Sequence, residues 1–205
     1  VLACSRNLEK SDALNKLAAE YPEQITLYAL DVADHGQIKK LSQTLANKPI
    51  DLLINNAGVF PDINDRSFGQ TDYDAWAHAF LVNTMAPLKM AEEFITQITQ
   101  SNRKTIVTIT SKMGSVADNG RGGSYIYRSS KSAVNMVVKS IAIDLESNGI
   151  ISVLLHPGWV RTDMGGPSGL ISVEQSVSGM LSVIREVTSA DSGKFIAYDG
   201  QIIPW

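Results

Sequence analysis

The 205-residue sequence is poor in cysteine, in basic clusters and in long apolar runs. Cys4 is the single cysteine, which excludes a disulfide within this sequence and suits a reducing compartment, so we expect a cytoplasmic protein. The formal net charge is -3 without any basic run, which disfavours binding to nucleic acid or anionic lipid. The longest apolar runs, such as residues 150–155, are far shorter than the roughly 20 residues of a membrane-spanning helix. Nucleic acid and membranes are therefore not expected partners, and self-association stays open.

Short apolar runs alternate with longer stretches of helical periodicity, a pattern typical of a parallel sheet with helices on both faces. The 44% hydrophobic and 19% charged content fits one domain over residues 1–205. The sequence thus predicts a three-layer, doubly wound α/β fold. Asp34 with Gln37, and Ser172 with Gln175, have the spacing of capping boxes. The expected strands are 1–4, 25–30, 50–54, 105–110, 150–155 and 194–197, and the expected helices are 12–20, 35–46, 73–99, 124–146 and 173–187.

Tyr127 and Lys131 lie four residues apart on the helical pattern 124–146, so a phenol and an ammonium share one helix face. A phenol whose pKa is about 10 is a poor acid or base at neutral pH, but a neighbouring cation stabilises the phenolate and lowers that pKa. The pair therefore indicates acid/base chemistry. Taken alone, a surface pair is the plainer interpretation of this spacing.

Ser111 ends the strand 105–110, at the edge of the sheet that the following helix would also reach. As a hydrolase nucleophile it would need a positioned base, and none of His35, His78 and His156 lies in a Gly-x-Ser-x-Gly elbow or a comparable setting. The remaining interpretations are a hydroxyl that binds a ligand at the edge and a serine that caps the next turn.

Two further segments combine amide side chains with a special backbone. The run Asn-Asn-Ala-Gly at residues 55–58 follows the strand 50–54, and such a turn lets the backbone approach a ligand closely. Asn83 precedes Pro87 by four residues in the helix 73–99, and proline cannot donate to the Asn83 carbonyl. That carbonyl is then free to hold a water, the alternative being a simple proline kink with a buried asparagine.

In chain order these elements are followed by Pro157, Gly158 and Thr162. The complete series resembles the short-chain dehydrogenase/reductase family over nearly the whole chain. Residues 158–164 and 198–205 resemble most the branch that contains C-factor and the sniffer-type carbonyl reductases. The resemblance implies a Rossmann-type domain and an oxidoreductase that transfers hydride between a nicotinamide and a carbonyl or alcohol substrate. A signalling or regulatory protein of the C-factor type, which binds the dinucleotide with little turnover, is the alternative.

The resemblance also implies a role for each site residue, with Asn83, Ser111, Tyr127 and Lys131 as the catalytic set and no metal. Tyr127 would donate a proton to the carbonyl oxygen, to which Ser111 also hydrogen-bonds. Lys131 would bind the nicotinamide ribose and lower the pKa of Tyr127, and Asn83 would hold a water that links the lysine to solvent. The expected cofactor-binding residues are Ser5, Arg6, Asp31, Val32, Asn55, Ala57, Gly58, Tyr127, Lys131, Pro157, Gly158, Val160 and Thr162.

The end of the first strand favours NADP over NAD. NAD-binding folds usually carry a carboxylate at the end of this strand, but here no carboxylate occurs before Glu9. Arg6 with Ser5 can instead bind a 2′-phosphate through charge-assisted hydrogen bonds. A solvated strand-end arginine is the alternative for Arg6. For the substrate, an apolar pocket lining suggests an aldehyde or ketone on a hydrophobic body, from the residues Phe60, Met113, Tyr125, Trp159 and Met164.

The chain lacks the first strand, glycine-rich turn and first helix of the family pattern, which would precede Val1. We expect about 25 residues upstream, since a whole βαβ unit takes 30 or more. In the family's strand order the missing strand is central, so the strands 1–4 and 50–54 are expected not to be adjacent.

Overall fold

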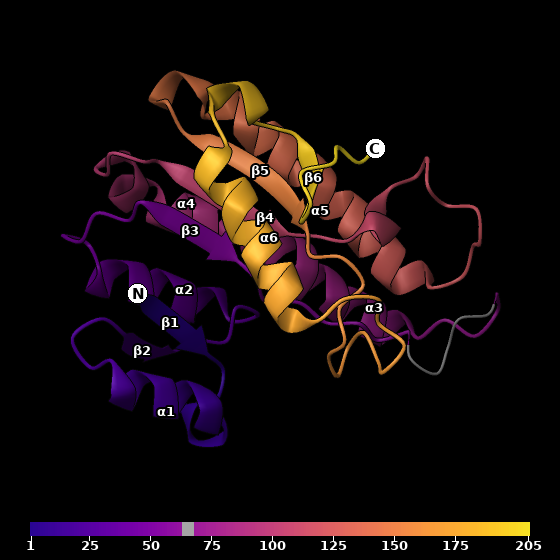
Figure 1. The fold of residues 1–205 in the computed structure, drawn as a ribbon, viewed down its shortest axis with the longest axis horizontal. Helices are drawn as coiled ribbons and strands as arrows, with labels where there is room; N and C mark the ends of the chain where they lie inside the picture. Colours follow the sequence, from indigo (N-terminus) through magenta and orange to yellow (C-terminus); the bar gives the residue numbers. More distant parts are fainter. Residues whose placement is uncertain (63–67) are drawn as a thin grey trace.

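The computed structural model describes residues 1–62 and 68–205, which form parallel strands between layers of helices (Figure 1). Two strands, β1 (Leu2–Ser5) and β2 (Thr26–Ala29), pair with each other. A four-stranded sheet has the order β3-β4-β5-β6. Its strands are β3 (Leu52–Asn55), β4 (Thr105–Ile109), β5 (Ile151–His156) and β6 (Phe195–Ala197). The α/β fold with a parallel sheet is therefore confirmed, and the strand bounds agree with the predicted ones to within two residues.

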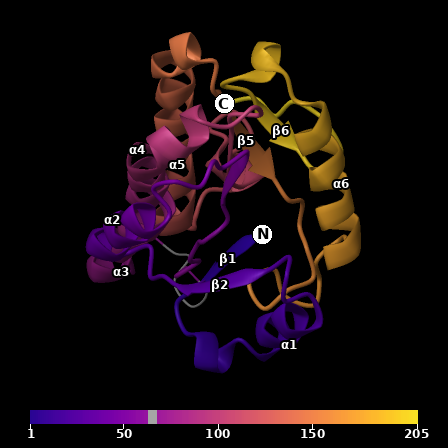
Figure 2. The same cartoon turned by 90° about the vertical axis from the view of Figure 1, so that its left-hand side faces the viewer.

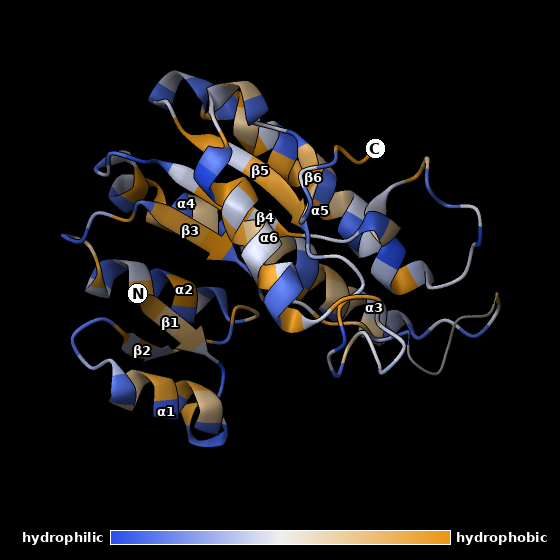
Figure 3. Ribbon diagram, in the orientation of Figure 1, coloured by the Kyte–Doolittle hydropathy of each residue, from blue (hydrophilic) through white to orange (hydrophobic). Residues whose placement is uncertain are grey.

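Helices cover both faces of the strands, as Figure 2 shows, with α2 to α5 on one side and α1 and α6 on the other. Alternate residues of β5 explain why, since successive side chains of a strand point to opposite faces. Leu154 joins a buried cluster with Val134 and Val138 of α5. Val153 and Leu155 join another with Ile184 of α6. The two faces of one strand thus bury two helix layers, and Figure 3 shows β3 and β5 as hydrophobic.

Most predicted helices agree with the structure. They are α1 (Asp12–Glu20), α2 (His35–Thr44), α5 (Tyr125–Asp144) and α6 (Val173–Glu186). The capping box of Ser172 and Gln175 is present at α6. At α2 the box is incomplete, because Asp34 accepts from the Gln37 amide while the Gln37 Oε1 atom accepts from the Asp31 amide instead.

The predicted helix 73–99 is divided by a π-helical turn over Leu81–Met85, between α3 (Tyr73–Phe80) and α4 (Ala86–Thr99). Pro87 lies at the start of α4, where its missing N–H matters least. The wider turn therefore accommodates the proline, and the irregularity takes the form of a π-bulge, a feature often found at functional sites, in place of the simple proline kink that was the alternative.

The strands β1 and β3 belong to separate sheets, which confirms that residues 1–4 and 50–54 are not adjacent. The core nevertheless continues from one part to the other. Leu30, which follows β2, shares one buried cluster with Ile38 of α2, Leu53 of β3 and Phe94 of α4. Within residues 1–62 and 68–205, no helix is long and apolar enough to cross a membrane.

Candidate active site

Ser111 follows β4 and lies at the carboxyl-terminal edge of the sheet, where the predicted catalytic residues meet. It has an extended backbone, and its hydroxyl accepts from the Met113 amide at 3.2 Å, which caps a 3₁₀ turn over Lys112–Gly114. The same hydroxyl lies close enough to the Tyr127 phenol to lower the pKa of that phenol. The capping interpretation and the ligand-binding interpretation of Ser111 are thus compatible in one geometry.

The turn after Ser111 is packed tightly against α5. A Cβ atom on Gly114 would lie 2.8 Å from the backbone carbon of Lys131, so only glycine allows this approach. The Gly114 carbonyl accepts from the Ser132 hydroxyl at 2.7 Å and from the Asn135 amide at 3.3 Å. The position of Ser111 relative to α5 is therefore fixed by contacts of its own turn.

Tyr127 is 8% exposed, and its ring is contacted from two sides. The ring of Phe60 lies edge-on to it, with centroids 4.7 Å apart and planes at 85°. The Nζ atom of Lys131 lies 5.8 Å from the centroid of the tyrosine ring and donates to the Ile109 carbonyl at 3.0 Å. The helical spacing of four thus brings phenol and ammonium together, as predicted.

The pKa of the Tyr127 phenol beside Lys131 differs from the value that the sequence predicts. Burial raises the pKa of the Tyr127 phenol, and the neighbouring Ser111 hydroxyl lowers it in part. The net lowering of this pKa that we predicted is therefore wrong for this arrangement, because burial of the phenol is the larger effect. Burial lowers the pKa of Lys131 to about 8, so that the side chain is still mainly charged at neutral pH.

Asn83 lies in the π-helical turn and is 1% exposed. Its amide nitrogen donates to the Val59 carbonyl and to the Ser130 hydroxyl, both at 3.0 Å, and its Oδ1 atom accepts from the Val59 amide at 2.8 Å. Ser130 in turn donates to the Tyr127 carbonyl at 2.9 Å. Asn83 therefore connects the segment after β3 to the helix turn that carries Tyr127 and Lys131, and its water-binding role stays a prediction.

The turn after β3 lies next to the same lysine. A Cβ atom on Gly58 would lie 3.6 Å from the Lys131 Nζ atom. Ala57 is exposed, whereas Asn55 is buried and its amide donates to the Thr108 hydroxyl at 3.3 Å. Gly58 and Ala57 thus line the edge, and Asn55 bonds the end of β3 to β4.

The segment after β5 contains the remaining predicted residues of this edge. Gly158 has a φ of 87°, and a Cβ atom there would meet Ile171 at 2.5 Å. The Pro157 carbonyl accepts from the Ser176 hydroxyl at 2.6 Å. Val160 bridges to Ile171, and the Thr162 hydroxyl accepts from the Gly165 amide at 3.1 Å. The segment is thereby folded back on itself beside the strand ends.

The residues that we predict to bind the adenosine part of the cofactor are more exposed than those around Tyr127. Ser5 shares a hydrogen bond of 2.7 Å with Ser11, and Arg6 is exposed, with no side-chain hydrogen bond or ion pair within residues 1–62 and 68–205. Asp31 accepts from the Ala33 amide at 2.9 Å, and Val32 packs partly against the main core cluster.

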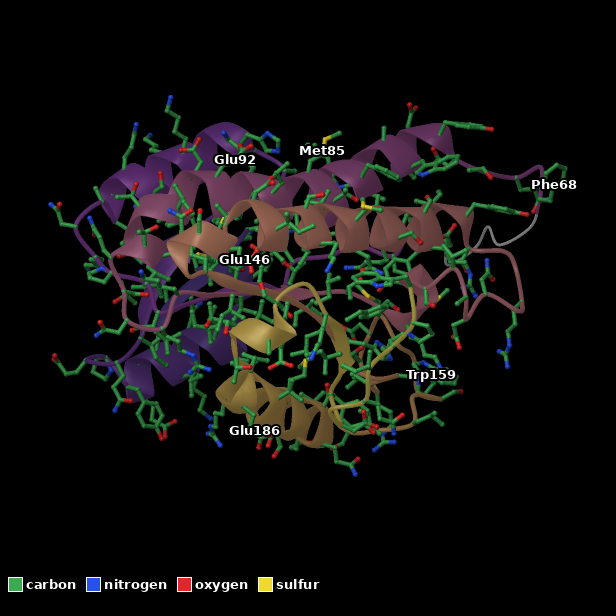
Figure 4. The ribbon with its side chains drawn as sticks, turned by 90° about the horizontal axis from the view of Figure 1, so that it is seen from above. Phe68, Met85, Glu92, Glu146, Trp159 and Glu186 are labelled. Atoms are coloured by element: carbon green, nitrogen blue, oxygen red, sulfur yellow. The ribbon has the colours of Figure 1, made fainter. Side chains whose placement is uncertain are left out.

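Among the proposed apolar lining residues, Phe60 and Met113 are half-buried. Tyr125, Trp159 and Met164 are 40%, 50% and 48% exposed. Figure 4 shows Trp159 and Phe68 toward the same end of the molecule, and the ring of Phe68 lies 6.5 Å from that of Tyr125. Exposed aromatic side chains are therefore present at this end, and their role in lining a substrate pocket stays a prediction.

Three contacts at the site involve residues that the sequence pattern does not single out: Ser130, Asp62 and His156. Ser130 joins Asn83 to α5, and Asp62 accepts from the Tyr127 amide. His156 accepts from the Lys112 amide through Nδ1 at 3.3 Å, and burial lowers its pKa to about 4. His156 therefore stays neutral near pH 7 and ties the end of β5 to the Ser111 turn.

Comparison with known proteins agrees with this geometry. Residues 1–169 match the family described as short chain dehydrogenase, and the chain belongs to that family. It is 40% identical to C-signal of Myxococcus xanthus over 168 residues, which cover 82% of this chain and 100% of the relative.

Solved carbonyl reductases have the same fold. The carbonyl reductase Sniffer of D. melanogaster superposes with a TM-score of 0.93 at 29% identity, covering 100% of this chain and 87% of that one. An NADPH-bound carbonyl reductase from chicken fatty liver gives 0.91 at 30% identity, with the same two coverages. The predicted family, branch and Rossmann fold are confirmed.

Proposed function

We propose that the protein is an NADP-dependent carbonyl reductase in which Tyr127 is the general acid. The observation that carries the proposal is the convergence of three groups: the buried Tyr127 phenol, the Ser111 hydroxyl beside it and the Lys131 ammonium 5.8 Å from the centroid of its ring. The bound cofactor would supply or accept the hydride at the carbonyl carbon. The chain itself has to supply the proton and hold the carbonyl oxygen.

In the reduction direction, the Tyr127 hydroxyl gives its proton to the carbonyl oxygen as hydride reaches the carbon, and an alcohol results. Ser111 donates a hydrogen bond to the same oxygen and opposes the build-up of negative charge there. The raised pKa of Tyr127 keeps the phenol protonated at neutral pH, and the transfer is driven by the negative charge that builds up on the carbonyl oxygen. Oxidation of an alcohol runs the same steps in reverse, with the phenolate as base.

Lys131 acts on the other side of the phenol. Its ammonium lies near Gly58, where the nicotinamide ribose would bind, so one cation would serve both the ribose and the tyrosinate. The Asn83 carbonyl would hold the water through which the lysine exchanges protons with solvent. The remainder of the nicotinamide groove would be lined by Asn55, Ala57, Gly58, Pro157, Val160 and Thr162. The adenine would contact Asp31 and Val32.

The cofactor preference depends on Arg6. A guanidinium at the end of β1, exposed and close in sequence to Ser5, fits a ribose 2′-phosphate, and no carboxylate opposes it before Glu9. The solved chicken reductase has NADPH bound, which supports the same choice.

A second function is favoured by the relative C-signal, whose name suggests signalling. In that case the dinucleotide would be bound as a sensing or structural ligand with little turnover. The complete Asn83, Ser111, Tyr127 and Lys131 set argues for the reductase.

The experiment is to purify the full-length gene product and follow NADPH and NADH oxidation at 340 nm against a panel of aliphatic and aromatic aldehydes and ketones. We expect turnover with NADPH and slower turnover with NADH. Tight NADPH binding without turnover on any member of the panel would contradict the reductase and support the sensor.

A further inference from the structure

The helix that carries Tyr127 begins without a cap from its own sequence. Ser124 precedes α5 with a left-handed backbone, φ 48°, and its side chain makes no capping hydrogen bond. The first amides of a helix have no partner within the helix, so another group has to satisfy them. At this helix the group comes from a distant part of the chain.

That group is the carboxylate of Asp62, which is 1% exposed. Its Oδ2 atom accepts from the Tyr127 amide at 2.7 Å, across 65 positions of sequence. Since α5 begins at Tyr125, Tyr127 is its third residue, and the third amide is one that a capping side chain normally binds. A carboxylate there also lies at the positive end of the helix dipole. Asp62 therefore caps α5 in the place of Ser124.

The segment that presents Asp62 is itself held in place. Val59 exchanges two hydrogen bonds with the Asn83 side chain, and Phe60 stacks edge-on against the Tyr127 ring. Residues 59–62 thus contact the proton donor at its ring and at its backbone amide. The same segment continues directly from the turn at residues 55–58, which borders Lys131.

We infer that Asp62 is a positioning residue for Tyr127: its carboxylate fixes the first turn of α5 so that the phenol meets Ser111. The inference rests on the proposed role of Tyr127 as the proton donor. The bond acts through the backbone, and a displacement of about 1 Å at a reacting group can reduce a rate about 100-fold.

The test compares Asp62→Ala with Asp62→Asn. The alanine variant removes the acceptor, and we expect its kcat to fall about tenfold or more with the KM for NADPH unchanged. The asparagine variant retains an acceptor oxygen of the same reach, and we expect kcat to return to within about twofold of the wild-type value. An asparagine variant as slow as the alanine variant, or an alanine variant with wild-type kcat, would overturn the inference.

Asp72→Ala is the matched control. Asp72 caps α3 through the amides of Asp74 and Ala75, so its loss costs a helix cap of the same kind without removing the acceptor of the Tyr127 amide. We expect a similar loss of thermal stability and a nearly unchanged kcat. An equal fall of kcat in Asp72→Ala would mean that the Asp62 effect is one of stability alone.

A double-mutant cycle with Tyr127→Phe separates positioning from a general effect. If Asp62 acts through the phenol, Asp62→Ala has no further effect on the residual rate of Tyr127→Phe, and additive effects contradict the inference. If Asp62→Ala does not fold, Asp62→Ser shortens the acceptor by one atom, and we expect kcat to fall about threefold. Wild-type kcat in that variant would likewise contradict it.

Hydrogen exchange distinguishes failure of this inference from failure of the proposed function. We expect exchange at residues 125–128 to speed up about tenfold in Asp62→Ala and not in Asp62→Asn, whether or not the wild type turns over any carbonyl. Unchanged hydrogen exchange in Asp62→Ala would contradict the capping role of Asp62. Absence of turnover in the wild type, with the exchange as expected, would contradict only the proposed reductase function.

Discussion

The region around Tyr127, here called the reaction end, and the region of β1, α1 and Arg6, here called the β1 end, are built in different ways. Around Tyr127 the functional side chains are buried and hydrogen-bonded, with Lys131 only 4% exposed. At the other end β1 and α1 contain no buried residue, and Arg6 projects from the strand end into solvent. The first region fixes groups relative to one another, and the second presents a charge.

This difference predicts different consequences of substitution. A change at the reaction end removes a group that neighbours cannot replace, because the packing leaves no room for substitutes. A change at the β1 end alters one exposed cation and leaves the core intact. The three predictions below test this contrast, from the largest expected effect to the smallest.

Tyr127→Phe should have the largest effect. It keeps the ring that lies edge-on to Phe60 and removes the hydroxyl that we propose as the proton donor. We expect carbonyl reduction to fall about 10² to 10⁴-fold, as is typical for loss of a general acid, while NADPH binding measured by fluorescence is retained.

Tyr125→Phe is the control, because Tyr125 is two residues away and 40% exposed. We expect at most a small change in kcat for it. Near-native turnover in Tyr127→Phe would contradict the assignment of Tyr127 as the proton donor, and Tyr125 would then be the first alternative donor to test.

Lys131→Met should show a smaller effect on rate and an additional effect on stability. Losing the ammonium should lower kcat and weaken NADPH binding together, and the residual rate of alcohol oxidation should rise with pH as the phenol ionises. For stability, the pKa of Lys131 is about 8 in the folded protein and 10.5 as the ordinary value. Between these values the unfolded chain binds more protons, so the free energy of unfolding of the wild type should increase with pH.

Urea unfolding of wild type and Lys131→Met, measured from pH 7.5 to 10, checks the sign. The wild type should gain stability relative to the variant as the pH increases across this window. A difference that does not change with pH would mean that burial leaves the lysine pKa at its ordinary value.

The sequence predicts much of the site because its motifs follow strands whose carboxyl ends meet at one edge. Tyr127 and Lys131 are four apart on one helix, so their meeting needs only helical periodicity. Asp62 could not be found in that way, since its contact with Tyr127 is set by how the loop after β3 returns over α5. His156 gives no signal beyond its place at a strand end. The raised pKa of Tyr127 depends on burial, which spacing alone does not supply.

The π-helical turn at Leu81–Met85 was also beyond the sequence pattern. Pro87 indicates a disturbance of the helix, but a kink and a wider turn satisfy the proline equally well until the packing of Asn83 and Thr84 is known. Both side chains bond to Ser130, which favours the wider turn. Local propensity thus locates the irregularity, and tertiary contacts decide its form.

Arg6→Ala should have the smallest effect, restricted to the choice of cofactor. An exposed guanidinium can bind a 2′-phosphate through charge-assisted hydrogen bonds, and NADH carries no such group. We expect the KM for NADPH to rise about tenfold, corresponding to about 1.4 kcal/mol, with the KM for NADH and both kcat values nearly unchanged.

Arg185→Ala, which removes an exposed arginine from the last turn of α6, is the matched control and should leave both Michaelis constants unchanged. The NADPH effect of Arg6→Ala should also shrink as salt is added, because an exposed ion pair is screened within about 10 Å at 0.1 M ionic strength. If Arg6→Ala instead raised the KM of both cofactors equally, Arg6 would be supporting the fold of the β1 end. The two ends of the molecule would then differ less than their burial implies, since an exposed side chain would be acting structurally.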